Sequence, residues 1–508
     1  MNSSAAASPP FAEPSAGEQA IRPARRGMAL FALLGFAAGL PFYMFSTVLV
    51  LRLQEYGAPL AIIGFFAWVQ LLPTVKFLWA PLLDRYDVPG FARFWGKRRG
   101  WIMLAQLGIF TSMAAMALPS VGASLPLTAL LAVLLAFWTT TLEIAADAWR
   151  IELYPTQEEQ GPIVAANVWG YRSAMVAAGS GALILADRAN WSVAYLAIAV
   201  IAVLPFPILV AMGPLRGTTV TPMAKRGAAL ASGLLAGGAI LAVTALAAGL
   251  LGWAVLAAAG RAGIGPDSNV TPVVLAISMV PFLIMAAALP KIRRAGPHSR
   301  LRRSAAWGPY VDFFWRYGTG ALLLMAFVSL YRMGDVLALN LSKPMVRDLG
   351  YSLSQMGRAD GVVALSASLL GVGLGGWLVT RWRIGWTLAL AALAAGIGNF
   401  AFVWLAHQPL SEWALYLVTG LDQFGNGMAG AVFVVYLSLL VNPRYPGAQF
   451  AFLTGFAFML PRLLAGAGGQ IVERIGYDRF FLLSGALSLA ALLFLPALAR
   501  IRPREDDA

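Results

Sequence analysis

GALLLMAFVSLYRMGDVLALNL, residues 320–341, is an apolar run with only two charged residues, Arg332 and Asp335. Its length matches the roughly 20 residues that a helix needs to cross a bilayer. A charge at the centre of a bilayer costs on the order of 2.5–3.5 kcal/mol on insertion scales, and such residues usually face a bundle interior or a water-filled path. The run therefore predicts a membrane helix that carries a functional site.

The composition of the whole chain agrees with a membrane protein. Of its 508 residues, 59% are hydrophobic and 12% are charged, whereas roughly 25% are charged in an average soluble protein. Helices satisfy their own backbone polar groups in lipid, so repeated apolar runs predict an all-α polytopic fold. The net charge of +14 fits Lys- and Arg-rich cytoplasmic loops, and we expect no nucleic-acid partner.

Fourteen membrane-spanning helices are predicted, grouped along the chain as six, two and six. They cover residues 28–53, 61–83, 101–119, 126–149, 163–186, 191–213, 228–257, 271–290, 319–341, 356–380, 384–406, 412–441, 448–472 and 478–499. The connecting segments on one side carry 25 Lys and Arg residues, and those on the other side carry 8. Because cytoplasmic loops are the cation-rich ones, both termini are expected in the cytoplasm.

The spans divide the chain into five predicted parts. These are a flexible cytoplasmic tail (1–27), a six-helix bundle (28–213), a linker with two extra transmembrane helices and a basic cytoplasmic loop (214–318), a second six-helix bundle (319–499) and a cytoplasmic tail (500–508). The charged pairs Asp187-Arg188 and Glu473-Arg474 recur at an offset of about half the chain. Two such halves in parallel repeat are typical of the major facilitator fold, in which the substrate site lies near the midplane.

A charged loop follows the second predicted span, where Asp84 and Arg85 precede a basic run that contains Arg98 and Arg99. An Asp and basic residues at helix ends can pair across the cytoplasmic face and hold the two halves in one state. The functional interpretation is a conformational latch, and the alternative is ordinary anchoring by cytoplasmic cations. We favour the latch, because Asp84 contributes nothing to anchoring.

Acidic residues inside the spans are candidates for proton coupling. Glu143 and Asp147 are four residues apart and hence on one helix face. In a low-dielectric setting two neighbouring carboxylates disfavour each other's ionisation, so one of them could hold a proton. Asp147 has an alternative role as a structural partner of Arg85 or Arg150. Together the candidates for proton coupling are Glu143, Asp335, Asp147 and Asp422.

Cations inside the spans are candidates for binding an anionic group of a substrate. The four candidates are Lys76, Arg172, Arg332 and Arg462. The alternative is a set of internal ion pairs, and Arg332 and Asp335, three apart, could pair with each other. The chain has no cysteine, so we expect no disulfide and no thiolate metal site. For a transporter we also expect no other metal site, no catalytic residues and no cofactor.

The sequence resembles the AmpG family of muropeptide permeases from about residue 30 to 495. The segments that carry the resemblance include Gly35-Phe-x-x-Gly-Leu-Pro41, Lys76-Phe-Leu-Trp-Ala-Pro-Leu-Leu-Asp-Arg-Tyr86, Arg98-Arg-Gly-Trp101, Asp147-Ala-Trp-Arg150, Gly170-Tyr-Arg172 and Tyr331-Arg-Met-Gly-Asp335. The chain departs from the family at Leu142-Glu143, at Asp360-Gly361, where the family commonly has a Lys, and at Asp422, where it has a Glu.

The resemblance implies a proton-driven importer in the inner membrane that works by alternating access. Its implied cargo is N-acetylglucosamine–anhydro-N-acetylmuramic acid, with or without a stem peptide, released during wall turnover. Import would feed cell-wall recycling and the signal for β-lactamase induction, a route to antibiotic resistance. Related branches carry acetyl-CoA or siderophores, and these remain the alternative cargoes. We expect the protein to be a monomer in the lipid bilayer.

Two other classes of protein are possible for a polytopic chain. A membrane enzyme such as a lipid-linked transferase would need paired Asp-rich metal motifs on cytoplasmic loops, and the sequence has none. A structural or sensor protein would need the internal charges only to pair with each other. We therefore interpret the chain as a secondary transporter and not as an enzyme.

Overall fold

In the computed structural model the described residues are 24–56, 67–88, 91–118, 124–212, 271–295, 299–304, 306–465 and 468–504. Most of them are helical, and no strand occurs within these ranges. The all-α prediction is therefore confirmed. The predicted span 228–257 and most of the predicted N-terminal tail lie outside the described residues.

The chain forms two compact units. Unit 1 takes the described residues of Met1–Gln70, Ala80–Thr221 and Leu437–Phe450, and unit 2 takes those of Leu71–Trp79, Pro222–Tyr436 and Ala451–Ala508. Unit 1 thus includes the end of α22 (Glu412–Leu440) and the start of α23 (Pro446–Ala465), which come late in the chain.

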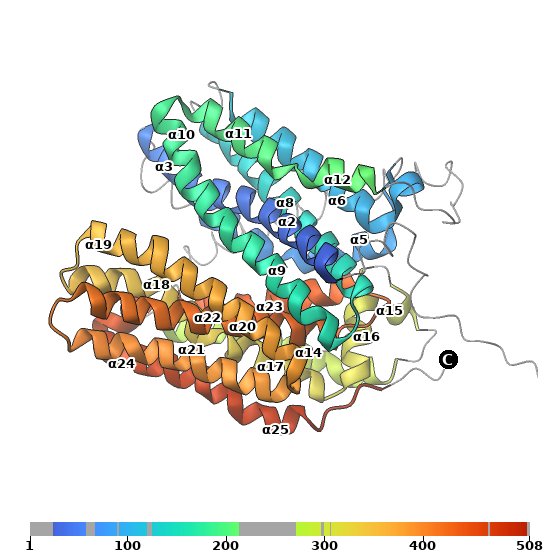
Figure 1. The fold of residues 1–508 in the computed structure, drawn as a ribbon. Coiled ribbons are helices and arrows are strands. Elements are labelled where there is room, and N and C mark those ends of the chain that lie inside the picture. The colour runs from blue at the N-terminus through green and yellow to red at the C-terminus, as the bar shows by residue number, and fades with distance from the viewer. Residues whose placement is uncertain are drawn as a thin grey trace, which may run out of the picture. The chain divides into compact units, whose positions relative to one another are not determined.

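The helices of unit 1 come mainly from the first part of the chain (Figure 1). They are α2 (Ala24–Tyr43), η1 (Met44–Val48), α3 (Leu49–Glu55), α5 (Ala80–Arg85), α6 (Phe91–Met116), α8 (Leu125–Leu153), α9 (Gln157–Val176), η4 (Ala177–Gly181), α10 (Ala182–Arg188), α11 (Trp191–Ala202) and α12 (Pro205–Ala211). The turn η2 (Ala67–Thr74) begins in unit 1 and ends in unit 2.

Unit 2 is built from the later helices and one short early turn. They are η3 (Lys76–Leu78), α14 (Thr271–Arg293), α15 (Arg300–Arg303), α16 (Gly308–Tyr317), α17 (Gly320–Tyr331), α18 (Met333–Asp348), α19 (Leu353–Arg358), η5 (Ala359–Ala364), α20 (Leu365–Arg381), α21 (Ile384–Ala406), most of α22 and α23, α24 (Gly468–Ala490), η6 (Ala491–Phe494) and α25 (Leu495–Leu498).

Nine helices in the described part of the chain are long and apolar enough to cross a membrane. They correspond to predicted spans 28–53, 126–149, 191–213, 319–341, 356–380, 384–406, 412–441, 448–472 and 478–499. The count of fourteen spans stays a prediction.

Prolines lie within the first two predicted spans. Pro41 lies inside α2, and a π-helical turn, η1, follows that helix directly. The second predicted span, 61–83, is not one α-helix in its described part but two 3₁₀ turns, η2 and η3, followed by α5. Pro73 lies within η2 and Pro81 within α5. Proline lacks an N–H and clashes with the preceding turn, so a continuous α-helix is not expected there.

The predicted span 319–341 is also broken, at Arg332. Helix α17 ends at Tyr331, Arg332 has φ −98° and ψ −4°, and α18 begins at Met333 and continues to Asp348. The break places Asp335 in the first turn of α18, where the free N–H groups of a helix favour a negative charge. The apolar pattern predicted the membrane segment but not this restart.

Helix α9 begins earlier than the predicted span 163–186 because polar residues cap it. The Thr156 hydroxyl accepts a hydrogen bond from the Glu159 N–H at 3.3 Å, and the Glu159 carboxylate accepts one from the Thr156 N–H at 3.3 Å. This capping box satisfies two backbone donors at the helix start. The result is a helix that starts at Gln157 with acidic residues in its first turn.

Glycines allow α2 and α9 to lie against each other (Figure 1). A Cβ on Gly35 would lie 2.0 Å from the carbonyl oxygen of Asn167, and one on Gly170 would lie 1.8 Å from that of Ala32. Gly39 contributes to the same close approach, because a Cβ on it would also clash with α9.

Part of the predicted basic loop of the linker forms a packed helix, α16. Helix α16 buries Phe313 and Phe314 within unit 2. Phe313 contacts Phe452 at a ring distance of 6.1 Å. Arg302 lies 4.1 Å from the Trp315 ring and 3.6 Å from Asp312. The loop's cations therefore contribute to packing as well as to charge.

Substituting Gly170 tests the close approach of α2 and α9. We expect Gly170→Ala to lower the free energy of unfolding by about 1–3 kcal/mol, because the new Cβ would overlap a backbone carbonyl that cannot easily move. Gly179→Ala in η4 is the control, since nothing lies within 4 Å of its Cβ. Thermal unfolding of both purified variants measures this, and equal melting temperatures would contradict the packing.

Candidate functional site

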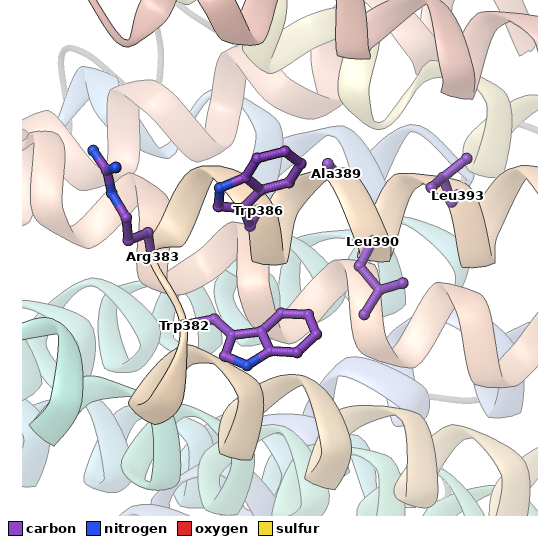
Figure 2. A pocket seen from close by; sticks show the side chains of 6 residues that line it. All are labelled: Trp382, Arg383, Trp386, Ala389, Leu390 and Leu393. Atoms are coloured by element: carbon purple, nitrogen blue, oxygen red, sulfur yellow. The ribbon is translucent and has the colours of Figure 1, made fainter.

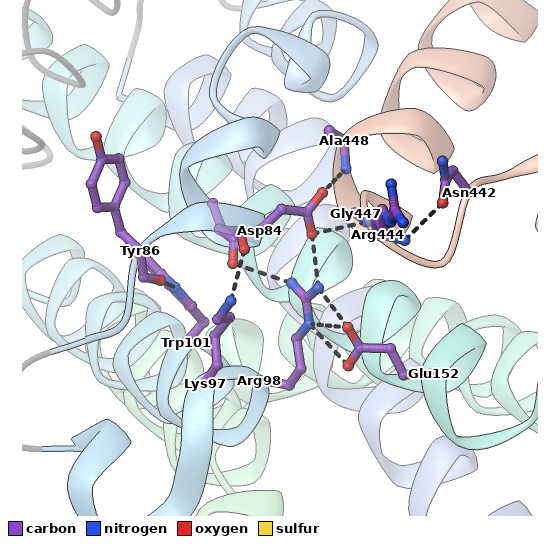
Figure 3. A network of polar contacts seen from close by, with 11 residues as sticks. Asp84, Tyr86, Lys97, Arg98, Trp101, Glu152, Asn442, Arg444, Gly447 and Ala448 are labelled. Atoms are coloured by element: carbon purple, nitrogen blue, oxygen red, sulfur yellow. Dashed lines mark hydrogen bonds and ion pairs between the residues drawn. The ribbon is translucent and has the colours of Figure 1, made fainter. Parts of the chain in front are cut away.

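Asp84 and Arg98 form a buried ion pair in unit 1 (Figure 3). The Arg98 guanidinium donates to the Asp84 carboxylate at 2.8 Å and to the Glu152 carboxylate at 2.7 Å. Gly96 has φ 77° and ψ 174°, a conformation that essentially only glycine adopts, and it directs the start of α6. Three helices, α5, α6 and α8, are thereby joined through one guanidinium.

The Asp84 carboxylate also caps the start of α23. It accepts hydrogen bonds from the N–H groups of Gly447 at 3.1 Å and Ala448 at 2.7 Å. Figure 3 shows these bonds on the side of the carboxylate away from Lys97, whose ammonium donates to the Asp84 carbonyl at 2.8 Å. A carboxylate at a helix N-terminus satisfies otherwise unpaired donors and interacts favourably with the helix dipole.

The electrostatics of this network keep Arg98 charged. Burial alone would lower the pKa of its guanidinium, but the neighbouring carboxylates of Glu152 and Asp84 outweigh burial, and the pKa is raised. The Asp84 side chain is 3% exposed and that of Glu152 is 28% exposed. The network is therefore closed on the Asp84 side and open to solvent on the Glu152 side.

The other two predicted latch residues lie elsewhere. Arg85 is exposed, and its guanidinium lies 5.9 Å from the Tyr86 ring. Arg99 is buried, and its Nε donates to the carbonyl of Trp95 at 2.9 Å. Asp84 and Arg98 are thus paired with each other, whereas Arg85 and Arg99 have different neighbours, and the latch stays a prediction.

Arg150 is the partner of Asp147, as the alternative interpretation of Asp147 anticipated. The guanidinium is buried and lies 3.1 Å from the Asp147 carboxylate. It also donates to Gln160 and, at 3.2 Å, to the hydroxyl of Ser438, and it lies 5.4 Å from the Phe450 ring. Ser438 and Phe450 belong to the late segment of unit 1. This geometry favours a structural role for Asp147.

Glu143 and Arg172 are the remaining candidates in unit 1. Glu143 lies one turn before Asp147 on α8 and is half-buried. Arg172 is half-buried on α9, near enough to Tyr43 for an electrostatic interaction with its hydroxyl. Both charges have partners within the protein. They lie on α8 and α9, whose connection is the short segment 154–156.

Arg332 is the centre of a buried polar cluster in unit 2. Its guanidinium donates to the Asp335 carboxylate at 2.8 Å and to the Asn426 side-chain oxygen at 3.2 Å. Asn399 lies near Asp335 and donates to the hydroxyl of Ser488 at 3.3 Å. The predicted pairing of Arg332 with Asp335 is confirmed. The cluster links α18, α21, α22 and α24 at the point where α17 gives way to α18.

Two of the predicted substrate-binding cations face the same aromatic ring. The Arg332 guanidinium lies 5.7 Å from the Phe458 ring centre, and that of Arg462 lies 5.5 Å from it. Arg462 donates to the Thr74 hydroxyl, and Lys76 lies two residues after Thr74, buried in η3. Unit 2 therefore gathers three cations, Lys76, Arg332 and Arg462, around segments 74–76 and 458–462.

Asp422 is close in sequence to this cluster but makes a different bond. It accepts from Gln423 at 2.9 Å and is half-buried, one turn before Asn426 on α22. The described part of the chain has no group of three or more His, Asp or Glu residues placed to hold a metal ion.

Several residues that complete these clusters were not among the predicted site residues. Asn399 and Asn426 were detectable in principle, because they are amides inside apolar spans, which is costly without a partner. Glu152 was visible as a carboxylate at the end of a span. Phe458 gave no signal, since an aromatic ring in a membrane helix has no distinguishing pattern.

The chain is similar in sequence and in fold to known transporter proteins. No family model matches the chain. A protein named "Putative transporter AmpG 4" from Rickettsia conorii is 27% identical over 467 residues, which cover 91% of this chain and 94% of the relative. The anhydromuropeptide permease of Escherichia coli K12 is 26% identical over 468 residues, which cover 92% of this chain and 78% of the relative. This chain is a homologue of the AmpG permeases.

Solved structures establish the fold of this AmpG homologue. The human organic anion transporter MFSD10 matches with a TM-score of 0.57 and 15% identity, over 93% of this chain and 99% of that protein. The major facilitator superfamily proton:xylose symporter XylE matches with a TM-score of 0.59 and 15% identity, over 93% of this chain and 94% of that protein. The AmpG homologue has the major facilitator fold. It is a multi-pass membrane transporter for a small molecule and not an enzyme.

Substitution at Asp84 tests which predicted latch residues matter in the AmpG homologue. We expect Asp84→Ala to lower the free energy of unfolding by about 3–5 kcal/mol, because it leaves Arg98 as a buried charge with one partner fewer. The adjacent exposed residue is the control, and Arg85→Ala should stay within about 0.5 kcal/mol of the parent. Thermal unfolding in detergent measures both, and equal losses would mean that Arg85 belongs to the network.

A double-mutant cycle tests the pair Arg332 and Asp335. We expect Arg332→Gln and Asp335→Asn each to destabilise the protein, and the double variant to lose about 0.5–3 kcal/mol less than the sum of the two. The exposed pair Arg358 and Glu412 is the control, where coupling should be much weaker because water screens it. Additive losses at Arg332 and Asp335 would show that the contact contributes nothing.

Proposed function

We propose that this transporter imports anhydromuropeptides into the cytoplasm together with protons, by alternating access. The likeness to the Escherichia coli anhydromuropeptide permease over 92% of the chain supports the cargo. The structural likeness to a proton:xylose symporter supports a fold that can couple solute and proton movement. The proposed location is the inner membrane with both termini in the cytoplasm, and the protein acts as a monomer without a cofactor.

The observation that carries the proposal is the pair of guanidinium groups around Phe458. Arg332 and Arg462 lie 5.7 and 5.5 Å from that ring, and buried Lys76 is close to Thr74, the hydrogen-bond partner of Arg462. Guanidinium groups bind carboxylates with two parallel hydrogen bonds. A stem peptide ends in a carboxylate and the attached sugars offer a hydrophobic face, so one cargo molecule can use the cations and the aromatic ring together.

Asp335 couples proton movement to cargo binding in this proposal. In the structure its carboxylate neutralises Arg332, and it competes with any substrate carboxylate for the same guanidinium. A proton taken up by Asp335 from outside removes that competition and frees Arg332 to bind cargo. Loss of the proton to the cytoplasm restores the internal pair and displaces the cargo. Glu143 is the corresponding proton-coupling candidate in unit 1.

Uptake by whole cells tests the proposal. Cells that lack their own permease and express this chain should accumulate labelled N-acetylglucosaminyl-anhydromuramyl tripeptide, and a proton ionophore should abolish the accumulation. Asp335→Asn and Glu143→Gln should lower proton-driven uptake by tenfold or more, roughly the effect of losing an essential proton carrier. Asp478→Asn, an exposed carboxylate that pairs with His407, is the matched control and should not change uptake.

Three outcomes would contradict parts of the proposal. Normal, ionophore-sensitive uptake by both acidic variants would exclude those residues as proton carriers. Uptake that ignores the ionophore would exclude proton coupling. No uptake of the muropeptide, combined with uptake of a siderophore or acetyl-CoA, would replace the cargo. Restored β-lactamase induction in the same cells gives an independent readout of import.

A further inference from the structure

An apolar groove opens at the start of α21, away from the buried charges of unit 2. It has a volume of ≈ 510 Å³, within the range of small-molecule pockets. Its lining consists of Trp382, Arg383, Trp386, Ala389, Leu390 and Leu393. Figure 2 shows the side chains along α21, with Arg383 at the end by the turn and the Trp382 indole beside the row.

The aromatic residues of this groove are exposed. Trp386 is 71% exposed and Trp382 is 50% exposed, and Leu390 and Leu393 are also accessible. Trp382 and Arg383 form the whole connection between α20 and α21, both of which belong to membrane-crossing segments. The turn therefore lies at a membrane surface, where tryptophan is enriched because its ring is apolar and its N–H is polar.

The turn also carries two cations. Arg381 and Arg383 are both exposed, and neither guanidinium forms an ion pair with any residue that the structure describes. In contrast, the exposed Arg358 at the far end of the α19–α20 segment pairs with Glu412. Two unneutralised guanidinium groups at the end of an apolar groove offer a positive site next to a hydrophobic one.

We propose that this groove binds an anionic phospholipid of the surrounding leaflet. The phosphate lies between Arg381 and Arg383, which provide planar donors suited to phosphate oxygens. One acyl chain follows α21 past Trp386, Leu390 and Leu393, which repeat at helical spacing along about 10 Å of the helix. The Trp382 indole, in the turn between α20 and α21, covers this acyl chain. The site is independent of the cargo and of the proton-coupling residues.

The charge pattern along the chain agrees with an anionic lipid as the occupant. Segment 381–383 belongs to the loops that carry 25 of the cations, the side expected in the cytoplasm. Anionic lipids of that leaflet attract juxtamembrane Lys and Arg residues. A zwitterionic lipid would fill the apolar groove equally well but would leave both guanidinium groups without a net negative partner.

Native mass spectrometry of the purified full chain tests the proposal. Protein titrated with phosphatidylglycerol should retain bound lipid at concentrations at which phosphatidylcholine of the same acyl chains does not bind. The double variant Arg381→Gln, Arg383→Gln should weaken phosphatidylglycerol binding roughly 25-fold, since each cation near anionic lipid contributes about a factor of five. The double variant Arg500→Gln, Arg502→Gln removes two exposed cations with the same spacing and should retain the parent affinity.

A second measurement reports on the groove itself. Phosphatidylglycerol brominated on its acyl chains should quench the tryptophan fluorescence of the parent protein more than that of Trp386→Phe. Equal thermal stability of all variants in detergent separates loss of the site from loss of the fold. Equal affinity for the two lipids, an unchanged affinity in Arg381→Gln, Arg383→Gln, or a dimer that dissociates in Trp386→Ala would each overturn the proposal, the last by showing that a second copy fills the groove.

Discussion

A charge that leaves water for a bilayer must be neutralised by the protein itself, because lipid offers it no partner. This constraint explains where several helices of the structure meet. Asp84 accepts from Arg98 and from two backbone N–H groups at the start of α23. Arg150 contacts Asp147 and Ser438. Each charged side chain contacts residues of several helices. The contacts that neutralise or solvate the charge therefore also determine how those helices pack.

The break at Arg332 shows how the constraint shapes a candidate site. A continuous helix would still place Arg332 and Asp335 on one face. Restarting the helix at Met333 adds the free N–H groups of the first turn of α18 beside Asp335. The carboxylate is paired with Arg332 in the first turn of α18, so a competing cargo or proton changes an existing ion pair rather than an isolated charge. A transporter needs an ion pair that can open, because a permanently closed ion pair would bind neither.

Most of the fold could be predicted from the sequence, and less of the site could. The apolar runs predict membrane helices because hydropathy depends on composition alone, and nine of them form helices long and apolar enough to cross a membrane in the described part of the chain. The prediction of a regular helix for the second span was wrong. Pro73 and Pro81 alter the backbone geometry there, and the number of apolar residues carries no information about that geometry. Local spacing correctly paired Arg332 with Asp335, three residues apart. Local spacing could not predict that Arg462 and Arg332 both lie next to the Phe458 ring, because the two arginines are far apart in the sequence.

By itself the sequence determined the class of protein, its membrane-crossing segments, the resemblance to AmpG permeases and the identity of the costly charges. These properties follow from composition and from local patterns, which need no knowledge of distant neighbours. Only the tertiary structure decided that Asp84 caps α23, that Asp147 pairs with Arg150, and that Arg85 lies outside the buried network. The reason is physical: a charge can choose among many partners of similar chemistry, and only the packing of helices from distant parts of the chain determines which partner lies within hydrogen-bond distance.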